Sequence, residues 1–173
     1  SCLNAQKLEE TTFGTVNDDV CYGAVRLGSN LYVSTYEASD YLRPSITSGK
    51  IYRFSDDLIK LDSIDISSAL GLSSKTTVNR IELDSDSTFR CYSRESISGN
   101  YLVSYFDTSL AFLDFYRVTV PDLNIRTIDC GAKLDGFLYL GGSAFSDSTR
   151  PFVFLPFLLK INEQTGQVVS FRM

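Results

Sequence analysis

The chain contains no histidine and no tryptophan. Without histidine it cannot form a Ser-His-Asp or Cys-His nucleophile pair, and it lacks the commonest transition-metal ligand. Its cysteines form no CxxC pair, so their spacing does not support a structural zinc site. Because no recognisable acid/base or nucleophile motif is present, we expect a protein that is not an enzyme and that holds no cofactor and no metal.

Basic clusters and long apolar runs are also missing. The 16 Lys and Arg residues are scattered singly along a chain of net charge −5. A nucleic-acid-binding surface needs clustered cations to neutralise phosphates, so we expect no nucleic-acid partner. No apolar run approaches the roughly 20 residues of a membrane span, so the sequence predicts no transmembrane segment.

Aromatic side chains are abundant, with 10 Tyr and 12 Phe among 173 residues. Aromatic and β-branched side chains suit half-buried strands, so the composition predicts an all-β fold. The length fits one domain that is large enough to bury a core. We expect an extended N-terminal segment at 1–21, which is polar and weakly patterned, followed by a single repeat domain at 22–173.

A strand-turn-strand pattern occurs three times. Each copy opens with a turn and an alternating apolar strand, at 28–34, 98–104 and 135–141. Each copy closes with an apolar strand that carries one basic residue, which is Arg53, Arg117 or Lys160. The pattern predicts units at roughly 22–66, 78–129 and 132–173. The wide spacing between Arg53 and Arg117 indicates an insertion or a degenerate fourth unit, formed by a hairpin around 84–87.

The third copy is the clearest. An Asp135-Gly136 turn leads a strand that ends in Gly141-Gly142, and a Leu-Leu-Lys-Ile strand at 158–161 turns back into a Val-Val strand at 168–169. This pattern, over 134–171, resembles a blade of a β-propeller, and the resemblance implies four-stranded antiparallel blades. At about 40–45 residues per blade the chain has room for at most four blades, and three can be recognised, whereas closed rings usually have about four to eight. The resemblance therefore implies a propeller that is incomplete or completed by another chain. A self-contained β-sandwich or barrel is the alternative.

Four cysteines, Cys2, Cys21, Cys91 and Cys130, are widely dispersed. Their even number and wide spacing favour disulfides in an oxidising compartment. The local pairing would join Cys2 to Cys21 and Cys91 to Cys130; buried free thiols are the alternative. The cysteines thus predict an extracellular, cell-surface or periplasmic protein.

Two loops, at 37–44 and 144–151, share Ala, Ser, Asp and a later Arg-Pro. Each lies between an opening strand and the strand with the basic residue. Equivalent loops of repeats emerge on one face, which is where repeat proteins bind partners. We therefore expect a binding face formed by Ser39, Asp40, Arg43, Ser146, Asp147 and Arg150. Ordinary connecting loops are the alternative.

These observations favour a non-enzymatic recognition or assembly module. It would use the repeat loops and exposed strand edges to bind a protein partner or itself. One alternative is part of a glycan-active or hydrolytic propeller enzyme that uses carboxylates, some of them from another segment. Another alternative is a structural subunit of a filament or surface layer. A small-molecule or glycan ligand is left open, because ten tyrosines could provide an aromatic surface.

Overall fold

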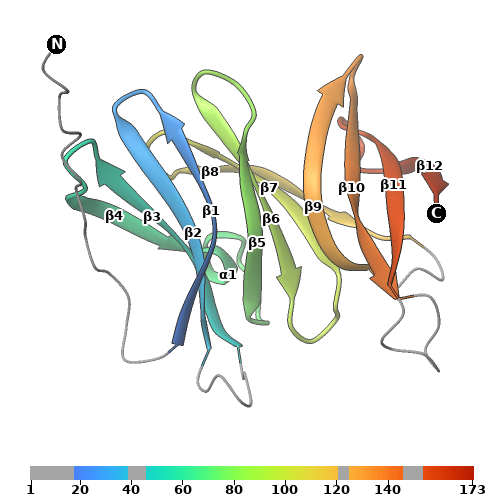
Figure 1. Cartoon of the computed structure of the whole chain (residues 1–173), viewed down its shortest axis with the longest axis horizontal. Coiled ribbons are helices and arrows are strands. Elements are labelled where there is room, and N and C mark those ends of the chain that lie inside the picture. Colours follow the sequence, from blue (N-terminus) through green and yellow to red (C-terminus); the bar gives the residue numbers. More distant parts are fainter. Residues whose placement is uncertain (1–17, 39–45, 121–124, 146–153) are drawn as a thin grey trace, which may run out of the picture.

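The computed structural model describes residues 18–38, 46–120, 125–145 and 154–173 (Figure 1). These residues form twelve strands and one short helix, so the predicted all-β class is confirmed. The strands make three four-stranded antiparallel sheets, each built from four consecutive strands. Within the described residues, no helix has the length and apolar character needed to cross a membrane.

Each sheet is a simple meander in which strands that follow one another in the chain are neighbours in the sheet. The first sheet contains β1 (Asp18–Leu27), β2 (Asn30–Ala38), β3 (Ile46–Ser55) and β4 (Lys60–Asp65). After the helix α1 (Ile66–Ala69), the second sheet contains β5 (Thr76–Leu83), β6 (Thr88–Glu95), β7 (Tyr101–Asp107) and β8 (Phe112–Val118). The third sheet contains β9 (Ile125–Leu134), β10 (Phe137–Phe145), β11 (Phe154–Asn162) and β12 (Val168–Arg172).

Turn chemistry fixes where the strands reverse. Asp135 and Gly136 both have positive φ, of 51° and 77°, between the paired residues Leu134 and Phe137. Two positive φ angles match a type I′ hairpin turn, whose twist suits the flanking strands. At α1, the side chain of Asp65 accepts a hydrogen bond from Ser68 N and caps the helix.

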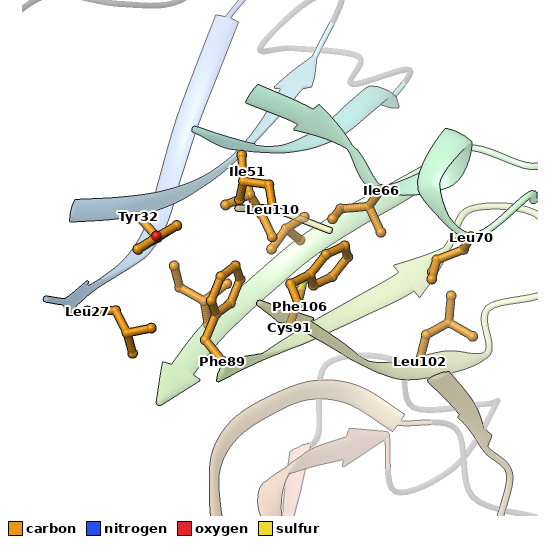
Figure 2. Close-up of a cluster of buried hydrophobic side chains, with 12 residues drawn as sticks. Leu27, Tyr32, Ile51, Ile66, Leu70, Phe89, Cys91, Leu102, Phe106 and Leu110 are labelled. Atoms are coloured by element: carbon orange, nitrogen blue, oxygen red, sulfur yellow. The ribbon is translucent and has the colours of Figure 1, made fainter. Parts of the chain in front are cut away.

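The second sheet lies between the other two, and both of its faces are buried (Figure 1). The core toward the first sheet includes Tyr32 and Ile51 from that sheet and Phe89 and Phe106 from the second sheet (Figure 2). The core toward the third sheet is a separate apolar cluster, formed from β6 to β11. Alternation along the strands supplies both cores, because successive side chains point to opposite faces.

The predicted alignment of the repeats is wrong in the second sheet. The segments 28–34 and 135–141 enter β2 and β10, which are second strands, whereas 98–104 enters β7, which is a third strand. The hairpin around 84–87 joins β5 to β6, the first two strands of the second sheet. It is therefore neither an insertion nor a fourth unit.

The expected disulfide between Cys91 and Cys130 is also wrong. Both are free thiols, as is Cys21; Cys2 lies outside the described residues. Cys91 is buried in the core between the first and second sheets, whereas Cys130 is exposed on the third sheet. Cys91 of the second sheet thus faces the first sheet, whereas Cys130 belongs to the third sheet, on the other side of the second sheet. An extracytoplasmic location, which depended on paired cysteines, stays a prediction.

Candidate functional site

One cross-strand position carries the same two residue types in all three sheets. It pairs the third residue of the second strand with the third-from-last residue of the third strand. One of the two residues is a tyrosine and the other is basic, and we call the two together the Tyr-basic pair. The three pairs are Tyr32 with Arg53, Tyr105 with Arg90, and Tyr139 with Lys160.

The first pair joins the first sheet to the second. Tyr32 donates a hydrogen bond from its hydroxyl to the carbonyl of Thr108, at 2.6 Å, and Arg53 Nη1 donates to the same oxygen at 3.0 Å. Thr108 lies in the β7–β8 turn, directly after Asp107. The pKa of Asp107 is lowered, chiefly by a hydrogen bond from Ser109 and to a smaller extent by the nearby Arg53. A tyrosine and an arginine thus bind one turn of the next sheet.

The second pair joins the second sheet to the third. Tyr105 donates from its hydroxyl to Glu163 Oε1 at 3.2 Å, and Glu163 lies in the β11–β12 turn. Arg90, whose side chain is only 5% exposed, lies 3.4 Å from Asp84 Oδ1. Lys133 of the third sheet contacts Asp84 at 2.6 Å and also Glu163. The tyrosine therefore again contacts the next sheet directly, whereas Arg90 is linked to that sheet only through Asp84, which also contacts Lys133.

Glu82 completes this network at the boundary of the second and third sheets. Its carboxylate accepts hydrogen bonds from Arg80 Nε at 2.7 Å, from the Tyr92 hydroxyl at 3.0 Å and from Gly131 N at 3.3 Å. Burial raises the pKa of Tyr92, which keeps the hydroxyl protonated as a donor. Each carboxylate in the network contacts a cation, so the network is suited to holding two sheets together.

Among the described residues, no further sheet covers the third pair. Leu138 and Leu140 point into the core toward the second sheet, so the alternating Tyr139 points the other way. Lys160 Nζ lies 3.9 Å from the centre of the Phe137 ring and 5.7 Å from that of Tyr139. This is a cation–π arrangement on an accessible surface.

Large apolar side chains surround this third pair. Leu134 is 59% exposed and Leu158 is 50% exposed, and strand pairing places both on the same face as Tyr139. We call the surface formed by Leu134, Phe137, Tyr139, Leu158 and Lys160 the outer face of the third sheet. The face of the first sheet that points away from the second sheet differs from it, because Val33, Tyr52 and Phe54 form a cluster there that is 2–7% exposed.

The six binding residues predicted from the sequence all lie outside the described residues. They are Ser39, Asp40, Arg43, Ser146, Asp147 and Arg150. Their loops connect β2 to β3 and β10 to β11, which are second and third strands in their sheets. The equivalent connection in the second sheet is the β6–β7 loop, at the lower edge of the view in Figure 1.

The β6–β7 loop is organised around Glu95. Arg117 Nη2 contacts Glu95 Oε1 at 3.1 Å, and Ser98 Oγ and Asn100 Nδ2 donate to Oε2. Burial raises the pKa of Glu95, but these hydrogen bonds and the Arg117 charge outweigh it, so the pKa is lowered overall. The loop places Ile97, which is 84% exposed, at its tip.

Sequence reasoning missed the Tyr-basic pairs as a set. It found Arg53 and Lys160, but it aligned them with Arg117, which lies in β8, a fourth strand. What identifies the pairs is their position in the strands, because each is formed by the third residue of a second strand and the third-from-last residue of a third strand. In the second sheet the two residue types exchange strands, with Arg90 in β6 and Tyr105 in β7.

Neither a metal site nor a known family accounts for these features. Among the residues that the structure describes, no three His, Cys, Asp or Glu side chains are grouped so that they could hold a metal ion. Asp84, which begins the Asp-Ser-Asp-Ser turn at 84–87, contacts the cations of Arg90 and Lys133.

No family model matches the chain. A search of curated proteins also finds no match.

Proposed function

We propose that this protein is a non-enzymatic assembly module, built from propeller-like blades, that binds a second copy of itself through the outer face of its third sheet. One observation carries the proposal. The tyrosines of the first two Tyr-basic pairs each donate a hydrogen bond to the sheet that follows, and the third pair, Tyr139 with Lys160, occupies the same position on an exposed face.

The character of this face supports the proposal. Interfaces between proteins are enriched in aromatic residues and have apolar centres with polar rims. Leu134 and Leu158 are half exposed or more and flank the Phe137 and Tyr139 rings. Within the chain, sheets already pack face to face at two boundaries. The partner that best fits the outer face of the third sheet is therefore another sheet. A second copy supplies such sheets.

A protein partner bound at the loops is a second candidate function. It is favoured by Ile97, an isolated apolar side chain held at the tip of a loop that Glu95 fixes. A fixed apolar anchor binds at low entropic cost. The remaining alternative, a carboxylate-dependent enzyme, stays a prediction; the acidic side chains that meet in the described residues, Glu82, Asp84 and Glu163, are all in ion pairs.

Solution mass tests the proposed function. We expect multi-angle light scattering to give an average mass above the monomer mass of 19.3 kDa, and this mass should rise with protein concentration. The measurement should cover about 1 to 200 μM, which is the range of weak to moderate protein association. Leu158→Asp places a charge in the centre of the outer face and should return the chain to a monomer. A wild-type monomer throughout this range would overturn the proposal.

Leu83→Asp is the matched control. Leu83 is 49% exposed, almost the same as Leu158, but it lies at the end of β5 in the second sheet. We expect this variant to associate like the wild type. Equal loss of association in both variants would mean that any exposed leucine matters, and the outer face would not be the interface.

A further inference from the structure

The turns between third and fourth strands are equivalent in the first and second sheets. In the β3–β4 turn, Ser55 N donates to Ile59 O at 2.9 Å and Leu58 N donates to Ser55 O at 3.0 Å. In the β7–β8 turn, Asp107 N donates to Ala111 O and Leu110 N donates to Asp107 O, both at 3.1 Å. Leu58 and Leu110 both have positive φ, of 56° and 66°. The two turns therefore have the same backbone conformation.

The same residue of the turn makes the contact with the preceding sheet. Thr108, the first residue after the paired Asp107, accepts hydrogen bonds from Tyr32 and Arg53. Glu163, the first residue after Asn162 in the β11–β12 turn, accepts the hydrogen bond from Tyr105. In the first sheet this position, directly after Ser55, is occupied by Asp56. The acceptor is the main-chain carbonyl in Thr108 and the side-chain carboxylate in Glu163, at the same position of the turn. Among the described residues, Tyr139 with Lys160 and the turn at Asp56 have this position but no such contact.

We propose that Tyr139 and Lys160 of one copy bind the β3–β4 turn of a second copy, at Asp56, so that the chains associate head to tail. This rests on the proposed function, because it names the segment that covers the outer face of the third sheet. The carbonyl of Asp56 takes the place that Thr108 O has inside the chain. The carboxylate of Asp56 adds a charge opposite to that of Lys160.

Charge and accessibility favour this turn as the occupant. The turn carries two acidic residues, Asp56 and Asp57, and both are exposed. Asp56 contacts Arg26 at 3.0 Å, but the two side chains are 51% and 68% exposed. An exposed ion pair of this kind contributes little and can be exchanged for another partner. Lys160 is held by the aromatic rings of its own sheet, so its amino group is positioned before binding.

The direction of the contact distinguishes it from a symmetric dimer. If two copies met symmetrically through the outer face, Lys160 would contact a residue of that same face in its partner, and Asp56 would have no role. In a head-to-tail contact, each interface uses Lys160 of one copy and Asp56 of the other. Such contacts close into a ring when the rotation allows it and otherwise extend as a chain.

A charge-exchange experiment tests the direction. We expect Lys160→Glu alone and Asp56→Lys alone each to weaken self-association by about tenfold or more, because each puts like charges together. An equimolar mixture of the two variants should associate with close to wild-type affinity. In the mixture, one interface is the wild-type pair and the other is the reversed pair. Sedimentation equilibrium of each variant and of the mixture gives these constants.

The outcomes separate the two proposals. If Leu158→Asp abolishes association while Asp56→Lys has no effect, the outer face is an interface but Asp56 is not its occupant, and the head-to-tail inference is wrong. If both single variants weaken association and the mixture does not recover, the two residues do not meet, and the inference is again wrong. If the wild type never associates, the proposed function itself fails.

Asp86→Lys provides the control for charge alone. Asp86 is an exposed aspartate in the β5–β6 turn, away from the third-to-fourth-strand turns. We expect Asp86→Lys alone to leave self-association unchanged, although it changes the net charge as much as Asp56→Lys does. Weakening of association by Asp86→Lys as large as that by Asp56→Lys would show that net charge, and not the β3–β4 turn, controls assembly.

Discussion

Tyr92 of the second sheet lies directly against the backbone of Gly131 in the third sheet. A methyl group at Gly131 would overlap with the Tyr92 hydroxyl and would also come within 3.1 Å of Leu140. The same tyrosine and the same glycine both donate to Glu82, at 3.0 and 3.3 Å. Glycine at this position therefore lets the two sheets approach closely enough to share one carboxylate.

Gly131→Ala should destabilise the fold. The added methyl group must displace Tyr92, which is fully buried, and overpacking of this kind costs about 1–3 kcal/mol. Urea unfolding followed by fluorescence or circular dichroism measures the loss. Gly23→Ala is the matched control, because a methyl group there meets its nearest atoms at an ordinary 3.6 Å. Equal effects of the two substitutions would contradict the close approach at Gly131.

The three tyrosines of the Tyr-basic pairs should respond differently to loss of the hydroxyl. Tyr32→Phe and Tyr105→Phe each remove a hydrogen bond between sheets, so each should lower the free energy of unfolding by about 1 kcal/mol. Tyr139→Phe should leave the stability of the dilute monomer unchanged, because its hydroxyl lies on the outer face. Thermal unfolding at about 1 μM compares the three, at the low end of the association range. A similar loss for Tyr139→Phe would mean that this hydroxyl is bonded within the chain.

The fold class could be predicted from the sequence because aromatic and β-branched residues alternate with turn residues along most of the chain. The order of the strands in the second sheet could not. The turn at 98–100 and the strand after it look locally like those at 28–34, yet one follows a second strand and the other a first. Only the long-range pairing of β6 with both β5 and β7 distinguishes them.

The site was hidden for a related reason. The strand β6 carries Arg90 at a buried position, and a buried arginine is not typical of a core strand. Its charge is compensated by the carboxylates of Asp84, at 3.4 Å, and Glu82, at 3.8 Å. Nothing local to the sequence of β6 shows these partners. The loops chosen from the sequence share a composition, but their residues lie outside the described part of the chain.

The cysteines should differ sharply in reactivity. Burial raises the pKa of the Cys91 thiol to about 12, against a smaller opposite effect of Ser104, so almost no thiolate is present at pH 8. Cys21 and Cys130 are exposed. We expect iodoacetamide at pH 8 to modify Cys21 and Cys130 in the native protein and Cys91 only after unfolding. Peptide mass spectrometry measures each site; rapid native labelling of Cys91 would contradict its place in the core.

Glu95 should make the protein less stable in acid. Its pKa in the folded state is below the ordinary value of 4.5, because hydrogen bonds from Arg117, Ser98 and Asn100 and the Arg117 charge outweigh the effect of burial. A carboxyl group with a lowered pKa stabilises the fold above its unfolded pKa, and this contribution is lost as the pH falls through the folded value.

Glu95→Gln should therefore cost about 1–3 kcal/mol near pH 7, since the Glu95 side chain is buried and the change leaves Arg117 without its charged partner. Below the ordinary value of 4.5 the difference between the variant and the wild type should shrink, because protonation removes the same charge from the wild type. Urea unfolding at a series of pH values from 7 down to about 3 measures both curves, across the acid range where carboxylates titrate. Asp86→Asn, at an exposed turn, should give a curve parallel to the wild type. If the Glu95→Gln curve is also parallel, the carboxylate does not hold the β6–β7 loop through its charge.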